Sequence, residues 1–256
     1  MALKEDTKNQ GSCNSCDTEV ACANCGLYGV LGVVSKLEQS TPEHLEKILK
    51  KRQVVAKGEN LFRTGQPFHG LYAIKSGSFK SYSFLEGGQE QVAGFHFPGD
   101  LLGLEAVSST RYSYSARALE DSSVCELKFE ELDLMQDHFQ QFQEQLILLL
   151  SNQILREQRQ SGLSVRQSAD ERVAAFLIGL SCRLEERGLA ATEFRLAMSR
   201  QDIASYLGLA VETVSRILKL FQKNGLLSVQ SKKINLIDKP GLREIAHIQN
   251  CCQESN

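Results

Sequence analysis

The cysteines are the side chains of this sequence best suited to chemistry, and four of the eight lie between residues 13 and 25. Cys13, Cys16 and Cys22 have the spacing C-x2-C-x5-C, which lets three thiolates on one short loop surround a compact centre. A fourth thiolate could come from Cys25, the next in line, or from Cys125 in the segment VCELKF. Zinc and iron–sulfur clusters both take four thiolates, and the spacing alone does not separate them. Thiols with no ligand role are the remaining alternative.

A second group of side chains, in the segment SRQDIASYLGLAVETVSRILKLFQKNGLL, has the types that read DNA bases. On a helix, residues at positions i, i+3, i+4 and i+7 share one stripe. A guanidinium on that stripe can bind guanine O6 and N7, and a carboxylate can accept from cytosine N4. The alternative is a solvated amphipathic helix pair with no role in DNA binding. The stripe carries Glu212, Ser215, Arg216 and Lys219, opposite an apolar face of Val214, Ile217, Leu218 and Phe221.

Short-range signals predict the elements that must position this stripe. Ser199 followed by Asp202 has the form of a capping box and begins a first short helix. Gly208 ends that helix, as the tight turn of a helix-turn-helix requires. A second helix is predicted from about residue 211 to 223, and Gly225 stops it.

The charge is basic only locally. The whole chain has a net charge of -2, so no global field announces a polyanion. Between residues 195 and 233, however, basic side chains outnumber acidic ones. The segment LLSVQSKKINLI predicts a hairpin, with Ser231, Lys232 and Lys233 at a tip that could contact phosphates.

Residues 54–129 predict a β domain. Runs of four to eight residues alternate apolar and polar side chains, which is typical of half-buried strands. Regular turn spacing with this many strands favours a small antiparallel barrel or jelly roll. The turns are marked by Gly58, Gly65, Gly77, the Gly87-Gly88 pair and the Pro98-Gly99 pair.

Residues 130–160 predict one long helix with two apolar rows. A second row is more than one core needs, so it favours pairing with another copy of the helix. Packing on its own domain alone is the alternative. The first row is Leu132, Met135, Phe139, Phe142, Leu146 and Leu149; the second is Ile147, Leu150 and Ile154.

Composition limits the class of protein. A length of 256 residues suits two domains, and 42% hydrophobic residues suffice for sizeable cores. No apolar run approaches the ~20 residues that span a bilayer, and the polar start lacks a signal-peptide core. We therefore expect a cytoplasmic protein with no membrane partner, where clustered cysteines bind metal rather than form disulfides. With five histidines, no Gly-rich phosphate loop and no nucleophile–base arrangement, the sequence does not favour an enzyme.

Long stretches between residues 54 and 237 resemble the CRP/FNR superfamily of bacterial transcription regulators, most closely its oxygen-sensing FNR/ANR branch. They include LYAIKSGSFKSYS, EQVAGFHFPGDLLGL, ALEDSSVCELKFEELD and the helix-turn-helix segment. The resemblance implies an α+β fold: an N-terminal double-stranded β-helix (a jelly roll like a cyclic-nucleotide-binding domain), a long dimerisation helix and a C-terminal winged helix-turn-helix. The expected units are a cysteine-rich cluster-binding segment 1–28, a sensor domain 29–130, the dimerisation helix 131–162 and a DNA-binding domain 163–256.

The same resemblance implies an oxygen-responsive activator or repressor of anaerobic genes. In this branch one 4Fe-4S cluster per subunit is bound by three N-terminal cysteines and a fourth in the strand motif V-C-E. The matching residues here are Cys13, Cys16, Cys22 and Cys125. Cys25 is an additional cysteine that could compete as a ligand. A regulator of the same superfamily controlled by zinc or another small ligand is the alternative.

The resemblance also implies how DNA is read. The branch motif V-E-T-x-S-R matches residues 211–216, so Glu212, Ser215 and Arg216 are expected to read the half-site TTGAT. A homodimer would place one recognition helix on each half of an inverted repeat in double-stranded DNA. The wider set of expected DNA contacts adds Ser199, Arg200, Thr213 and Lys219.

The dimer is expected to be marginal. Ile147, Leu150 and Ile154 would pair across a two-fold axis, but Glu157 stands where the branch carries an acidic residue. Two facing carboxylates repel when they are close and poorly solvated. RNA polymerase is a further expected partner, with residues 86–88 and the loops around Ser76 as contact surfaces by family analogy.

Cyclic-nucleotide sensing is not expected. Superfamily members that bind cyclic nucleotides hold the ribose and phosphate with a Gly-Glu step and an Arg-Ser pair. Gly103-Leu104 and Tyr114-Ser115 stand at the matching positions. A buried phosphodiester would then lack its charge-assisted partner.

Overall fold

The computed structural model describes residues 52–128, 167–186 and 190–248, with helical positions 144, 147, 148, 150, 151 and 154. The expected cluster ligands Cys13, Cys16 and Cys22 lie outside the described residues, as do Cys25 and Glu157. The expected domain limits near residues 28, 130 and 162 lie outside them as well.

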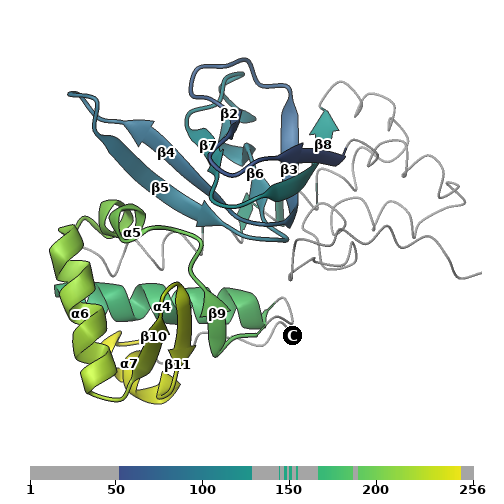
Figure 1. The fold of residues 1–256 in the computed structure, drawn as a ribbon. Coiled ribbons are helices and arrows are strands. Elements are labelled where there is room, and N and C mark those ends of the chain that lie inside the picture. The colour runs from purple at the N-terminus through teal and green to yellow at the C-terminus, as the bar shows by residue number, and fades with distance from the viewer. Residues whose placement is uncertain are drawn as a thin grey trace, which may run out of the picture.

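Residues 52–128 form a β domain of two four-stranded antiparallel sheets (Figure 1). The strand orders are β1-β8-β3-β6 and β2-β7-β4-β5, so the predicted jelly-roll class is confirmed. The predicted glycine turns are also present, because Gly58, Gly65, Gly77 and Gly99 all have positive φ. The strands are β1 (Arg52–Val55), β2 (Asn60–Phe62), β3 (Gly70–Ser76), β4 (Phe79–Phe84), β5 (Glu90–His96), β6 (Leu101–Leu102), β7 (Ser115–Ala118) and β8 (Ser122–Lys128).

Aromatic and branched side chains fill the interior of the β domain. The rings of Phe62 and Tyr112 stack with their centroids 3.9 Å apart, and the Tyr72 ring stacks on Phe62 with a centroid distance of 5.8 Å. Phe79 and Ile74 are fully buried beside them. Tyr112 also donates a hydrogen bond to the Gly70 carbonyl, so its hydroxyl is satisfied inside the core.

The C-terminal domain is a winged helix-turn-helix, as predicted (Figure 1). A three-stranded sheet of order β10-β11-β9 forms the wing, and α6 packs on β10. The pairing of β9 and the last helix were not predicted from the sequence. The elements are α4 (Ala169–Glu185), β9 (Glu193–Arg195), α5 (Arg200–Leu207), α6 (Val211–Lys223), β10 (Leu227–Gln230), β11 (Lys233–Leu236) and α7 (Lys239–Ile245).

One of the two hydrophobic cores combines residues of the β domain with residues of the C-terminal domain. One cluster fills the interior of the β domain. The other contains the buried face of the helix-turn-helix together with Val92, Phe95 and Phe97 from β5 and the loop after it. Cys182 in α4 belongs to that second core, and it is in a disulfide. A disulfide at this residue was not predicted from the sequence. Within the described ranges, none of the helices combines the length and hydropathy needed to cross a bilayer.

Gly77 provides a test of the turn between β3 and β4. Its φ is +79°, and a Cβ built there would lie 2.1 Å from Ser122 Oγ, whereas Gly58 has φ +85° and open space around it. Gly58→Ala should therefore cost about 1 kcal/mol from backbone strain alone, and Gly77→Ala about 2 kcal/mol more because β8 must shift. Urea unfolding of both variants measures the difference. Equal losses would contradict this account of the turn.

His96 in β5 makes the stability depend on pH. Its Nε2 lies 3.0 Å from Ser81 Oγ, and burial lowers the pKa of His96 from 6.5 to about 4, with Asp100 opposing and Arg183 reinforcing the shift. Between pH 6.5 and pH 4 the imidazole of His96 binds a proton in the unfolded state but not in the folded state, so the free energy of unfolding falls as the pH falls through this range. Between pH 7 and pH 5 the unfolding free energy of the wild type should fall by about 2 kcal/mol more than that of His96→Gln. Parallel pH curves would show that His96 does not contribute.

Candidate DNA-binding site

Helix α5 begins and ends as the sequence predicts. Ser199 Oγ accepts a hydrogen bond from the Asp202 amide at 3.0 Å, and the Asp202 carboxylate accepts one from the Ser199 amide at 2.9 Å. This reciprocal pair is a capping box, which satisfies two donors that a helix start leaves open. At the other end Gly208 has φ 64° and closes the helix, so the chain turns into α6 within three residues.

Helix α6 presents the predicted stripe to solvent. Val214, Ile217, Leu218 and Phe221 are buried, as expected. On the opposite face Glu212, Arg216 and Lys219 are exposed, while Thr213 and Ser215 are half-buried. Helix α6 lies at the outer edge of the molecule in Figure 1, away from the β domain. The major groove of DNA is wide enough to admit an α-helix, and an exposed helix with polar and charged side chains on its outer face is suited to bind there.

The wing adds basic side chains beside α6. Ser231 adopts φ 59° at the tip between β10 and β11. Lys232 and Lys233 are exposed there, and Lys233 forms an ion pair with Glu193 of β9. Residues 193–195 and 230–233 line a recess of about 500 Å³. Exposed cations at the rim of a concave surface suit a phosphate backbone.

Arg200 is the first residue of α5 and is half-buried. Burial lowers the pKa of its guanidinium. In the part of the chain that the structure describes, this guanidinium has no hydrogen bond or ion pair. Because a partly desolvated cation gains from an added anion, Arg200 is suited to a phosphate at the start of α5. The Ser199 hydroxyl, in contrast, is already engaged in the capping box.

Cys125 lies in the middle of the first sheet. Its strand β8 is paired with β1 on one side and β3 on the other, opposite Arg52 and Ala73. The side chain is half-buried and is not in a disulfide. A thiol held on a rigid strand in this way fits the donor that zinc or an iron–sulfur cluster needs. Of the four expected ligands it alone is described, and the described residues contain no group of three metal-binding side chains.

The positions expected to contact a cyclic nucleotide do not form such a site. Leu104 is buried at 8% exposure and carries no carboxylate. Ser115 Oγ accepts a hydrogen bond from the Thr64 amide at 3.0 Å, so it serves a turn of the β domain. Tyr114 supplies no positive charge. These residues therefore lack the ionic partner that a buried phosphodiester requires.

The described helical positions between 144 and 154 expose apolar side chains. Ile147 and Ile154 are helical and 60% and 53% exposed, and Leu148 is 55% exposed. Leu150 is half-buried. Exposed aliphatic residues at this spacing are typical of a helix that packs against another surface.

Comparison with known proteins agrees with this architecture. Residues 171–245 match the Crp-like helix-turn-helix domain, and residues 52–138 match the cyclic nucleotide-binding domain. The structure of FixK2 from Bradyrhizobium japonicum is similar, with a TM-score of 0.69 and 31% identity, covering 76% of this chain and 96% of that one.

Two relatives show the branch. The transcriptional activator protein anr of Pseudomonas aeruginosa is 43% identical over 225 residues, which are 88% of this chain and 92% of that protein. The fumarate and nitrate reduction regulatory protein of Escherichia coli is 40% identical over 232 residues, covering 90% and 92%. The first relative is named a transcriptional activator and the second a regulatory protein, and residues 171–245 of this chain match the Crp-like helix-turn-helix domain. The chain is therefore a DNA-binding transcription regulator of this type and not an enzyme. The chain belongs to the CRP/FNR family of transcription regulators, in its FNR/ANR branch.

Proposed function

We propose that this chain is an oxygen-responsive transcription regulator whose dimerisation and DNA binding depend on a 4Fe-4S cluster. The observation that carries the proposal is Cys125, a thiol on the interior strand β8, in a chain whose N-terminal segment supplies four further thiols, Cys13, Cys16, Cys22 and Cys25. The relative from Escherichia coli is a regulator of fumarate and nitrate reduction, which supports the same physiological setting.

Through the cluster, the cysteines would link two segments that are far apart in the sequence. Cys13, Cys16 and Cys22 would hold one side of the cluster and Cys125 the other, one cluster in each subunit. When bound, the cluster supplies an oxygen-labile link between the N-terminal segment and β8. The rigid β8 fixes the fourth thiolate, so the position of the N-terminal segment depends on whether that link exists. Cys25 is the competing ligand.

DNA reading is assigned to α6 and its surroundings. Glu212, Ser215 and Arg216 would read TTGAT, with Arg216 placed to bind guanine and Glu212 to accept from cytosine N4. Thr213, near the start of α6, would contact the DNA backbone. Ser199, at the start of α5, is expected to do the same, but its hydroxyl donates to Asp202 at 2.6 Å and would have to leave the capping box to donate to a phosphate. Phosphate contacts are assigned to Arg200, Lys219 and Lys232.

Dimerisation is assigned to the long helix. The exposed Ile147 and Ile154, with Leu150 between them, would pack against their counterparts in a second subunit. Glu157 would bring two carboxylates together across the axis, which keeps the dimer marginal and therefore easy to regulate. Two such subunits would bind an inverted repeat of the half-site, one recognition helix on each.

RNA polymerase is the remaining partner of the proposal. The hairpin between β4 and β5 exposes residues 86–88 and places Phe84 and Leu85 beside them at 61% and 49% exposure. That hairpin is assigned as a contact surface. Ser76 is 2% exposed and hydrogen-bonded to Ser123, so near that position the contact would have to come from its neighbours.

Anaerobic purification tests the cluster. The protein should contain about four iron and four sulfide ions per subunit and a broad visible absorbance that bleaches in air. Cys125→Ser should lose the iron and the operator binding, whereas Cys25→Ser should keep both. Stoichiometric zinc would favour the alternative, a family member controlled by another ligand. Iron-free protein that still dimerises and binds its operator would refute the cluster proposal.

Arg216→Ala tests base reading. Its loss should cost about 1–3 kcal/mol of binding free energy and relax specificity at one base pair. Lys219→Ala should instead weaken binding to all sequences about equally and reduce the salt dependence. Fluorescence anisotropy with single-base variants of the TTGAT inverted repeat measures both. A uniform loss for Arg216→Ala would place its guanidinium on a phosphate.

A further inference from the structure

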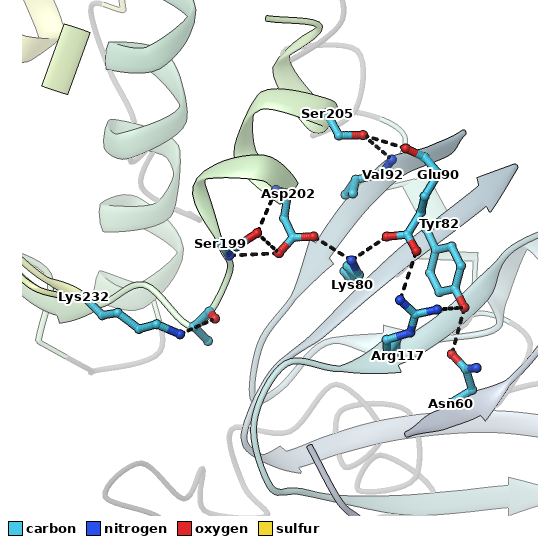
Figure 2. A network of polar contacts seen from close by, with 11 residues as sticks. Asn60, Lys80, Tyr82, Glu90, Val92, Arg117, Ser199, Asp202, Ser205 and Lys232 are labelled. Carbon is cyan, nitrogen blue, oxygen red and sulfur yellow. Dashed lines mark hydrogen bonds and ion pairs between the residues drawn. The ribbon is translucent and has the colours of Figure 1, made fainter. Parts of the chain in front are cut away.

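The edge of the β domain is completed by a helix of the C-terminal domain. Strand β5 is the last strand of its sheet, so one row of its backbone groups has no strand partner. The Val92 amide donates instead to Ser205 Oγ of α5 at 3.0 Å, and that hydroxyl donates to the Glu90 carbonyl at 3.2 Å (Figure 2). Gln91 Nε2 also donates to the Ser205 carbonyl at 2.8 Å. Helix α5 thus provides the hydrogen bonds of a missing strand.

A buried lysine joins the two domains at the same contact through its ammonium group. Lys80 of β4 is 8% exposed, and its Nζ lies between Glu90 and Asp202, 2.6 Å from the Asp202 carboxylate (Figure 2). Arg117 of β7 contacts the other oxygen of Glu90 at 3.0 Å. Cations and carboxylates therefore alternate from β7 to α5. A buried charge is tolerated only with such partners, so this row of ions specifies one arrangement of the two domains.

Asp202 serves both the contact and the local helix. One carboxylate oxygen accepts from Lys80, while the other accepts from the Ser199 amide and hydroxyl in the capping box. Burial alone would raise the pKa of Asp202, but the hydrogen bonds from Lys80 and Ser199 outweigh it and hold the pKa below its usual value. The start of α5 is consequently tied to a side chain of the β domain.

Apolar packing supports the ions. The Phe95 ring of β5 meets Tyr206 of α5 at 5.2 Å and Phe176 of α4 at 5.9 Å, both edge to face. Arg183 of α4 donates to the Phe95 carbonyl at 3.0 Å and pairs with Asp100. Aromatic packing and these polar contacts therefore join β5 to α4 and α5, around a small cavity of about 20 Å³ that Phe95, Phe176 and Tyr206 help to line.

We propose that Lys80 is a positioning residue for DNA reading, which holds the recognition helix in its DNA-competent orientation from within the β domain. Lys80 fixes the start of α5, and α5 joins α6 through the short turn at Gly208. With α5 docked in this way, Arg216 and Lys219 of α6 stay exposed. A dimer on an inverted repeat needs both recognition helices at a fixed spacing and angle. The inference rests on the DNA-binding function and does not require the cluster.

The test compares Lys80→Met with the wild type in anaerobically purified full-length protein. Methionine keeps the packing of the unbranched stem but removes the charge. Affinity for the TTGAT inverted repeat should fall about tenfold, while affinity for a duplex with a single half-site should not change, because Lys80 does not contact α6. Lys80→Arg should restore most of the loss. Hydrogen exchange at the Val92 and Asp202 amides should speed up in the methionine variant.

Lys239→Met is the matched control. Lys239 pairs with Glu185 at 2.7 Å, but both residues belong to the C-terminal domain. This variant should bind the inverted repeat as the wild type does. If Lys80→Met does not fold, Ser205→Ala tests the same contact by leaving the Val92 amide without its acceptor, and it should show the same selective loss.

The outcomes separate this inference from the proposed function. A wild type that does not bind the inverted repeat would contradict the proposed DNA site. If the wild type binds and Lys80→Met binds equally well, the positioning role is overturned. Tighter binding by Lys80→Met would also overturn it, because docking would then oppose DNA reading. An equal loss on the half-site and the inverted repeat would indicate damage to α6 itself rather than to its orientation.

Discussion

Strand β5 belongs to a sheet of the β domain and also packs against the C-terminal domain, and the arrangement of the two domains depends on this shared strand. One edge pairs with β4, while the other edge and the side chains of Val92 and Phe95 pack on the C-terminal domain. Backbone donors buried away from water must find acceptors. The position of α5 is therefore set by the hydrogen-bonding needs of a strand in the other domain.

The ions along this contact explain why the arrangement is specific as well as stable. An apolar interface tolerates sliding, whereas an ammonium between two carboxylates satisfies its donors in one geometry only. Asp202 also caps α5, so forming the helix and placing it use the same group. The jelly roll, the edge strand, α5 and α6 thus form a continuous series of packed elements, from the interior of the β domain to the charged stripe of α6 that is proposed to read DNA.

Much of the C-terminal domain was predictable because its signals are local. The Ser199–Asp202 capping box, the turn at Gly208 and the buried face of α6 each depend on residues within seven positions of one another, and the structure confirms them. The ion pair of Lys80 with Asp202 was not predictable, since the two residues are 122 positions apart and the alternating pattern of β4 indicates only that some of its residues face inward. Strand β9 was missed because its three residues gain stability only by pairing with β11. The thiols of the N-terminal segment were found by spacing, but what they bind depends on chemistry that spacing does not encode.

The hydroxyl of Ser205 has a consequence for how such a molecule can be turned off. If the C-terminal domain rotated away from the β domain, the backbone N–H and C=O groups along the free edge of β5 would become exposed. A strand of another chain could then pair with that edge. A hinge that opens freely would carry a risk of aggregation each time it opened. Dissociation of the dimer, in contrast, would end DNA binding while α5 still covers the edge of β5, so it would carry a lower risk of aggregation.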